Sequence, residues 1–177
     1  MKRLWAPWRL DLIEAEAPPG CIFCDLPAQE GLAADRKNLI LGRSRTSFAI
    51  LNRYPYNNGH LMVIPRRHTA DFTDLAVEEL ADLGRLLQLS LKALEKSYAP
   101  DGFNVGMNLG RAAGAGIAGH LHWHAVPRWN GDTNFMPVLA DTKVMIEHLD
   151  RSWERLHEAL SLLLSDHPSS SRSPSSA

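Results

Sequence analysis

His120-Leu-His122-Trp-His124-Ala-Val126 is the stretch that decides the fold, with three histidines alternating with apolar residues. Strict alternation is the periodicity of a β-strand, which predicts that the three imidazoles share one face of a strand. Leu121, Trp123 and Ala125 would then share the opposite, buried face. A row of three imidazoles is a poor way to build a core, because each buried ring needs a polar partner. Such a row suits a metal site, or chemistry at phosphorus or an acyl carbon.

The composition is that of one globular domain of ordinary size, with 177 residues of which 45% are hydrophobic. Nineteen basic residues nearly balance twenty acidic ones, so no bulk attraction to nucleic acid or to a membrane surface is expected. No apolar run reaches the length of about 18 residues that spans a bilayer, and the first residues lack the apolar core of a signal peptide. We therefore expect a soluble, cytoplasmic protein.

The strand pattern begins before the histidine row. Residues 39–51 predict two short strands, the clearer being Ser47–Leu51, and the turn formers of 52–59 lead to a partner strand at His60–Pro65. Residues 102–108 predict a further strand. Strands paired by hairpins, with helices inserted and appended, indicate an α+β domain with an antiparallel sheet.

Two main helices are expected. The first would be capped by Thr73 or Asp74 and run to about Tyr98, and the second would cover Lys143 to Leu164. Their expected inward positions are Leu80, Leu83, Leu87, Leu91 and Leu94 in the first, and Met145, Leu149, Leu156, Leu160 and Leu163 in the second.

The two cysteines, Cys21 and Cys24, have the spacing of a zinc knuckle. A closed tetrahedral site needs two further ligands, for which His68 and one histidine of the row are the natural candidates. The alternatives are a pair of reduced, buried cysteines or a redox couple. A thioredoxin-like motif is less well supported, because it should open a helix directly after a strand, whereas Cys21 follows Pro-Pro-Gly.

If one histidine of the row binds a metal, two remain for chemistry. Histidine can attack phosphorus or an acyl carbon, and a neighbouring imidazole can protonate the leaving oxygen. The loop 110–119 carries four glycines, whose backbone amides could approach a phosphate, although such loops are often only turns. Asn104 and Asn108 could reach the same pocket, or they could face solvent. Asn52 and His60 flank the other loop, where either could be a turn residue.

These motifs resemble the histidine triad (HIT) family, whose signature is His-x-His-x-His followed by two apolar residues. The segments 51–65 and Val126–Trp129 also resemble that family, and the likeness spans about residues 20–135. Residues 4–9 and 102–110 look most similar to bacterial members assigned as diadenosine tetraphosphate phosphorylases or hydrolases. The resemblance implies a sheet-and-helix protomer that forms a homodimer. Trp5, Trp8 and Trp153 add to this expectation, because a small domain does not easily cover so much aromatic surface.

The resemblance also implies roles for individual residues. His122 would be the nucleophile that forms a nucleotidyl-histidine, and His124 would contact the oxygen at the scissile bond. The nucleotide site would comprise Asn52, His60, Asn108, Gly114, Ala115, Gly116, His122 and His124. In zinc-bearing members a CxxC pair joins two histidines, which maps to Cys21, Cys24, His68 and His120 and implies a structural Zn²⁺. Mg²⁺ could be carried with the nucleotide.

One departure concerns the second step of the reaction. Some phosphorylase members carry Gly-Gly-Ser where this chain has Gly114-Ala115-Gly116, and the missing hydroxyl leaves the acceptor open between phosphate and water.

The sequence therefore predicts a nucleotidyl hydrolase or transferase acting on a dinucleoside polyphosphate such as diadenosine tetraphosphate. The alternatives are a hydrolase of nucleoside phosphoramidates or aminoacyl adenylates, and a non-catalytic nucleotide-binding protein. The expected organisation is an N-terminal arm (1–20), a histidine triad domain (21–135), a C-terminal extension with a helix (136–166) and a disordered tail (167–177).

Overall fold

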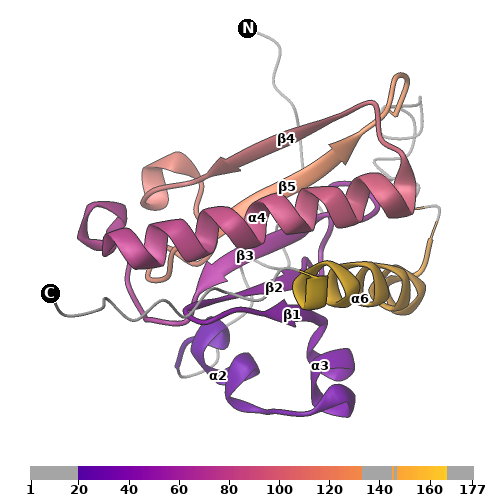
Figure 1. Ribbon diagram of the computed structural model, residues 1–177. Helices are drawn as coiled ribbons and strands as arrows, with labels where there is room; N and C mark the ends of the chain where they lie inside the picture. Colours follow the sequence, from indigo (N-terminus) through magenta and orange to yellow (C-terminus); the bar gives the residue numbers. More distant parts are fainter. Residues whose placement is uncertain (1–19, 133–144, 146, 167–177) are drawn as a thin grey trace, which may run out of the picture.

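The computed structural model describes residues 20–132, 145 and 147–166 (Figure 1). The predicted N-terminal arm, apart from Gly20, and the predicted tail lie outside the described residues. The start of the predicted C-terminal extension also lies outside them, up to residue 144. The expected domain boundaries therefore stay predictions.

Five strands form one antiparallel sheet, which confirms the α+β class. Its spatial order is β1-β2-β3-β5-β4, so β1 and β4 are the edges. The strands are β1 (Ile40–Arg43), β2 (Ser47–Leu51), β3 (Leu61–Pro65), β4 (Gly102–Met107) and β5 (Trp123–Arg128).

Two long helices, α4 (Val77–Tyr98) and α6 (Leu149–Asp166), lie across one face of this sheet (Figure 1). They cover the strands with a continuous hydrophobic core, as expected for an amphipathic helix on a sheet. Trp153 of α6 belongs to that core: it is 4% exposed and its indole N–H donates to the carbonyl of Ile40 at 2.8 Å. The expectation that Trp153 adds apolar surface for a dimer is therefore wrong.

The first helix begins later than predicted. Thr73 and Asp74 lie in a short 3₁₀ helix, η2 (Phe72–Asp74), whose cap is the side chain of Asp71. The helix α4 starts three residues later, where the side chain of Glu79 accepts from the backbone N–H of Ala76. Its buried face also differs, because Leu80 is exposed while Leu86 and Leu89 are buried.

Two short helices were not predicted. The helix α2 (Ile22–Ala28) starts directly after the first cysteine, Cys21, and α3 (Leu32–Asn38) leads into β1 (Figure 1). Each has only seven residues and α2 contains Pro27, so neither produces a periodic apolar pattern long enough to detect. Residue Phe23 of α2 nevertheless reaches the core.

The histidine row is only partly a strand, since β5 starts at Trp123 rather than at His120. The partner strand β3 ends at Pro65, whose nitrogen has no hydrogen to donate to a ladder. The N–H of Leu121 instead donates to the carbonyl of Thr69 at 2.8 Å. Sequence alternation alone therefore overestimated the strand by three residues.

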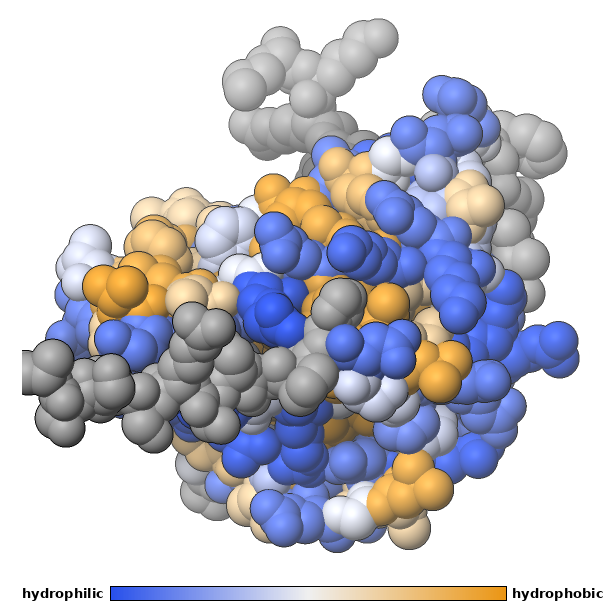
Figure 2. All heavy atoms as spheres, viewed as in Figure 1, coloured by the Kyte–Doolittle hydropathy of each residue, from blue (hydrophilic) through white to orange (hydrophobic). Residues whose placement is uncertain are grey.

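The face that carries the helices is mixed in character. Figure 2 shows hydrophilic side chains interspersed with separate hydrophobic patches over the part drawn in colour. Among the described residues, no helix is both long enough and apolar enough to cross a membrane.

Candidate active site

A pocket of about 450 Å³ lies over β4 and β5 beside His124. In β5, Pro127 approaches α4 near Gly59, so His124 and Val126 point to the opposite face of the sheet. The pairing of β4 with β5 sets Gly106 against His124 and Asn104 against Val126, which opens space above the strands. The lining residues are Tyr56, Asn57, Asn104, Val105, Gly106, Met107, Asn108, His124, Val126 and Arg128.

The imidazole of His122 is buried and held by one backbone hydrogen bond. Its Nδ1 lies 2.8 Å from the carbonyl oxygen of His120. Because a carbonyl can only accept, Nδ1 carries the proton, and the neutral ring keeps a lone pair on Nε2. Burial lowers the pKa of His122, an effect that the bond to His120 opposes. The ring is therefore neutral near pH 7, with Nε2 in the form that a nucleophile requires.

His124 has the opposite proton arrangement. The backbone N–H of Tyr56 donates to Nδ1 of His60 at 3.0 Å, so neutral His60 carries its proton on Nε2. That nitrogen lies 3.0 Å from Nδ1 of His124, which must accept. The proton of His124 is then on Nε2. The rings of His122 and His124 are 5.0 Å apart, so an unprotonated nitrogen and an N–H donor are offered side by side.

Two of the expected nucleotide contacts, Asn52 and His60, are not among the residues that line this pocket. His60 is fully buried and lies against His124 rather than at the pocket surface. Asn52 approaches the same nitrogen of His60 at 3.5 Å and accepts from the backbone N–H of Tyr54. The structure therefore connects both residues to His124 rather than to the pocket wall.

The glycine loop joins the pocket through Asn108. The side-chain amide of Asn108 donates to the carbonyl of Gly114 at 3.4 Å. Gly114 has a φ of 88°, in the left-handed region that favours glycine. Gly114 and Gly116 are exposed and Ala115 is half-buried. The loop therefore lies beside a residue of the pocket, although its own residues are not among the lining set.

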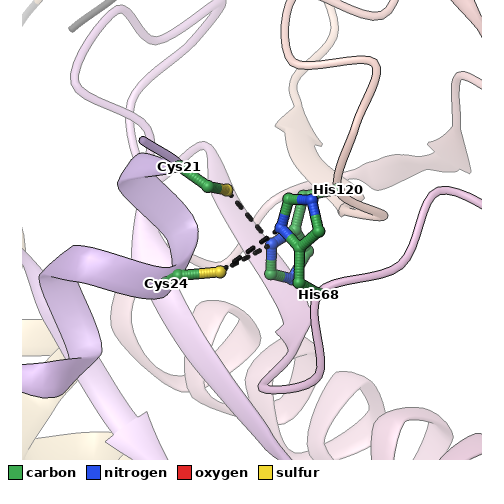
Figure 3. A group of neighbouring side chains, drawn as sticks. All are labelled: Cys21, Cys24, His68 and His120. Atoms are coloured by element: carbon green, nitrogen blue, oxygen red, sulfur yellow. Dashed lines mark hydrogen bonds between the residues drawn. The ribbon is translucent and has the colours of Figure 1, made fainter. Parts of the chain in front are cut away.

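Four side chains converge at the other end of the histidine row (Figure 3). The ligand atoms of Cys21, Cys24, His68 and His120 all lie within 4.8 Å of one another. Nε2 of His120 donates to the carbonyl of Pro65 at 2.8 Å, which leaves Nδ1 as a lone pair facing the sulfurs. That Nδ1 lies 3.3 Å from Cys21 Sγ and 3.6 Å from Cys24 Sγ, and His68 Nδ1 lies 3.4 Å from Cys24 Sγ.

These distances fit a tetrahedral zinc site. Bonds of about 2.3 Å to sulfur and 2.0 Å to nitrogen place neighbouring ligand atoms about 3.5 Å apart in a tetrahedron. Burial and the adjacent Cys21 raise the pKa of Cys24 to about 11, so two thiolates this close need a cation to balance them. Burial also lowers the pKa of His120, which favours the neutral ring that a metal ligand must be. Within the described residues, this tetrad is the group of three or more such side chains near enough to share an ion.

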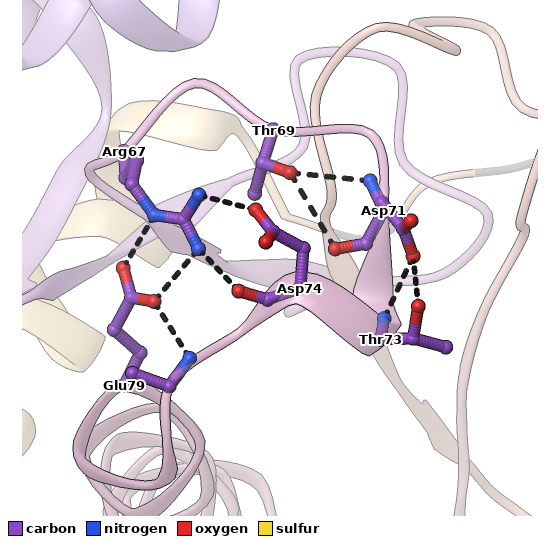
Figure 4. Close-up of polar contacts among 7 residues, drawn as sticks. Arg67, Thr69, Asp71, Thr73, Asp74 and Glu79 are labelled. Atoms are coloured by element: carbon purple, nitrogen blue, oxygen red, sulfur yellow. Dashed lines mark hydrogen bonds and ion pairs between the residues drawn. The ribbon is translucent and has the colours of Figure 1, made fainter.

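The loop that carries His68 is held by ion pairs (Figure 4). Arg67 donates to both carboxylate oxygens of Glu79 at 2.9 Å and to Asp74 at 2.8 Å. Next to His68, the carbonyl of Thr69 accepts from Leu121, so the His68 loop and the His120 segment are bound together. We call these ion pairs of Arg67 with Glu79 and Asp74 the clamp; the sequence alone did not predict them.

Among the polar side chains of the pocket, Tyr56, Asn57 and Arg128 were not predicted. The guanidinium of Arg128 donates to Asp132 at 2.6 Å and to Oδ1 of Asn104 at 2.7 Å. Asn57 donates to the same carboxylate at 3.0 Å. The β4–β5 register could have found Arg128, because it sets Gly102 against Arg128 next to the Asn104–Val126 pair. Tyr56 and Asn57 lie between β2 and β3, outside that register.

Comparison with known proteins gives a consistent match. The HIT domain family matches residues 34–131. An "AP-4-A phosphorylase" of Mycobacterium tuberculosis is 40% identical over 166 residues, covering 88% of this chain and 82% of the relative. A crystal structure of a Zn-bound histidine triad family protein from Mycobacterium smegmatis aligns with a TM-score of 0.64 at 29% identity, covering 84% of this chain and 98% of that one. The crystal structure of a hypothetical histidine triad nucleotide-binding protein from Sulfolobus tokodaii aligns with a TM-score of 0.65 at 25% identity, covering 86% of this chain and 100% of that one.

Proposed function

The chain belongs to the HIT domain family, and from this premise we propose that it cleaves a dinucleoside polyphosphate through a nucleotidyl-histidine on His122. Family membership and the similarity to an AP-4-A phosphorylase support a nucleotide hydrolase or transferase. The finer assignment, to a substrate of the diadenosine tetraphosphate kind and to a covalent intermediate, is the proposal.

The observation that carries the proposal is the proton arrangement of the two neighbouring histidines. His122 offers a lone pair on Nε2 because its Nδ1–H is bound to the His120 carbonyl. His124 offers an N–H on Nε2 because its Nδ1 accepts from His60. An attacking nitrogen beside a hydrogen-bond donor suits displacement at phosphorus: His122 forms the P–N bond, the P–O bond to the leaving nucleotide breaks, and the Nε2–H of His124 donates a hydrogen bond to the oxygen that leaves with the electron pair.

The second step returns the nucleotidyl group from His122 to an acceptor. The P–N bond breaks as the new P–O bond forms, His122 leaves as the neutral ring, and any proton that the acceptor loses passes to solvent, while His124 keeps its Nε2–H. Water would give AMP and ATP from diadenosine tetraphosphate, whereas inorganic phosphate would give ADP and ATP. Gly114, Ala115 and Gly116 offer no side-chain hydroxyl to a bound phosphate, so phosphorolysis would depend on backbone amides.

We further propose that the Cys21, Cys24, His68 and His120 tetrad holds Zn²⁺. Four protein ligands leave no open coordination position, so the ion would supply structural closure rather than a reactive site. The tetrad joins α2, which precedes the matched family region, to the histidine row. A homodimer and Mg²⁺ carried with the nucleotide are also part of the proposal, the first supported by the exposed edge strand β4.

The deciding experiment is to trap the intermediate. Protein mixed with diadenosine tetraphosphate labelled at the α-phosphorus is quenched within one turnover and analysed for label on His122. We expect label on the unaltered protein and none on His122→Asn, which should still bind nucleotide because the pocket residues are unchanged. Full turnover by His122→Asn would overturn the covalent mechanism.

The same experiment separates the alternatives. A non-catalytic nucleotide-binding protein would bind the substrate but acquire no label. A panel containing a nucleoside phosphoramidate, an aminoacyl adenylate and diadenosine tetraphosphate, with and without inorganic phosphate, would identify the leaving group and the acceptor from the products.

A further inference from the structure

Phe23 connects the cysteine pair to the proposed nucleophile. It lies between Cys21 and Cys24 in the first turn of α2 and is 2% exposed. Its ring contacts the ring of His120 edge-on, with centroids 5.6 Å apart and planes at 88°. It also contacts the ring of His122, with centroids 5.2 Å apart and planes at 50°. One aromatic side chain therefore touches both a member of the tetrad and the nucleophile.

The imidazole of His122 needs such a contact. The hydrogen bond from Nδ1 to the His120 carbonyl fixes one atom of the ring but leaves the ring able to pivot about that bond. Two ring contacts oppose the pivot: His124 at 5.0 Å and Phe23 at 5.2 Å. The direction of the lone pair on Nε2 therefore depends on where Phe23 lies.

The position of Phe23 depends in turn on what holds α2. A seven-residue helix containing a proline has little stability of its own. Two hydrogen bonds hold the end of α2: Asn38 donates to the carbonyl of Leu26, and Arg43 donates to the carbonyl of Pro27. Its start is held by the contacts of Cys21 with His120 and of Cys24 with His68. The cysteine end is the end that carries Phe23.

We propose that Phe23 is a positioning residue for the reaction: the tetrad anchors the start of α2, and α2 holds the Phe23 ring against His122 so that Nε2 stays aligned for attack. This inference rests on the proposed role of His122. The tetrad would then affect catalysis as well as stability. A change that frees Cys21 or Cys24 would also free the Phe23 ring from its contact with the ring of His122.

The test compares Phe23→Leu with Phe48→Leu. Phe48 is a fully buried phenylalanine of the same core, on β2, so its replacement removes the same atoms from the interior. The readouts are the single-turnover rate of label transfer to His122, the affinity for nucleotide, the zinc content and the melting temperature. A further readout is the imidazole ¹⁵N–¹H spectrum of His122 in histidine-labelled protein.

We expect both variants to lose comparable thermal stability, and Phe23→Leu alone to label His122 about 10- to 100-fold more slowly, the cost of a small misplacement of a reacting group. Its nucleotide affinity and zinc content should stay those of the unaltered protein. The Nδ1–H signal of His122 should be sharp in the unaltered protein and in Phe48→Leu, and broadened in Phe23→Leu.

Equal labelling rates and equal His122 spectra in the two variants would overturn the proposal. Absence of label in the unaltered protein would refute the nucleophilic role of His122, while the His122 spectrum would still decide whether Phe23 fixes the ring. If Phe23→Leu does not fold, Phe23→Met, which keeps nearly the full side-chain volume, is compared with Phe48→Met by the same measurements.

Discussion

His60 Nε2 lies 3.0 Å from His124 Nδ1, and this contact determines which nitrogen of His124 carries the proton. His60 can donate there because its own Nδ1 accepts from the backbone of Tyr56. A fully buried side chain outside the pocket wall thus controls which nitrogen of His124 can donate. In the proposed reaction, His60 would therefore act through His124.

The first prediction follows from that relay. His60→Asn should lower kcat about 10- to 100-fold, because His124 would no longer be held as the Nε2–H tautomer and a hydrogen-bond donor to the charge that develops on the leaving oxygen is worth about 10²–10³ in rate. KM should change little, because His60 does not line the pocket. Steady-state kinetics with diadenosine tetraphosphate measure both constants.

The control for this prediction is His157→Asn. His157 is a half-buried histidine of α6 that contacts the carbonyl of Leu41 at 2.9 Å, far from the triad in the fold. It should retain kcat. A His60→Asn enzyme as fast as His157→Asn would remove His60 from the mechanism.

The second prediction concerns the tetrad. Cys24→Ser should lower the zinc content from one ion per chain and reduce the melting temperature strongly, since structural zinc in small peptide sites contributes on the order of 10–16 kcal/mol at neutral pH. Metal analysis and thermal melts measure these. Asp25→Asn, an exposed change in the same helix, should keep both. Unaltered protein that contains no zinc and reacts as two ordinary free thiols would contradict the site.

Sequence reasoning succeeded where a pattern is local and failed where a contact depends on the fold. The antiparallel sheet and the end of α4 at Tyr98 follow from alternation, helical periodicity and a following proline. The four residues of the tetrad do not form a local pattern, since Cys21 and His120 are 99 residues apart; the family resemblance implied them as metal ligands, and the structure brings them together.

Other features could not be obtained in this way. The start of β5 is set by Pro65 on another strand, and the burial of His60 is set by His124, which is 64 residues away along the chain. The helix α2 is too short to show periodicity, yet it places Phe23 against the ring of His122. Each of these features depends on a contact between residues that are far apart in the sequence.

The third prediction concerns assembly. Among the described residues β4 is an edge strand, and Val105 on it is 41% exposed, so an edge backbone and an apolar side chain are offered that suit a second copy. Sedimentation equilibrium should give about twice the chain mass of 19.7 kDa, and Val105→Asp should shift it toward one chain. Leu162→Asp, at a comparably exposed leucine of α6, should remain dimeric. A stable monomer of the unaltered protein at micromolar concentration would contradict the dimer.

The last prediction concerns acid stability and the clamp on the His68 loop. Hydrogen bonds from Arg67, then from the backbone of Ala76, lower the pKa of Glu79 to about 2. A glutamate in the unfolded chain has a pKa of about 4.3, so between these values the unfolded state binds more protons than the folded state. The stability that this carboxylate contributes is therefore complete above about pH 5 and is lost as the pH falls toward 2.

Glu79→Gln removes that titration but leaves the other carboxylates in place. Its free energy of unfolding should be lower than that of the unaltered protein at pH 6, and the difference should shrink steadily as the pH falls through 4 to 2.5. Urea unfolding across this range measures it. Glu78→Gln, an exposed neighbour on the same helix turn, should follow the unaltered protein throughout. Parallel pH profiles for Glu79→Gln and the unaltered protein would show that the clamp does not contribute to stability through Glu79.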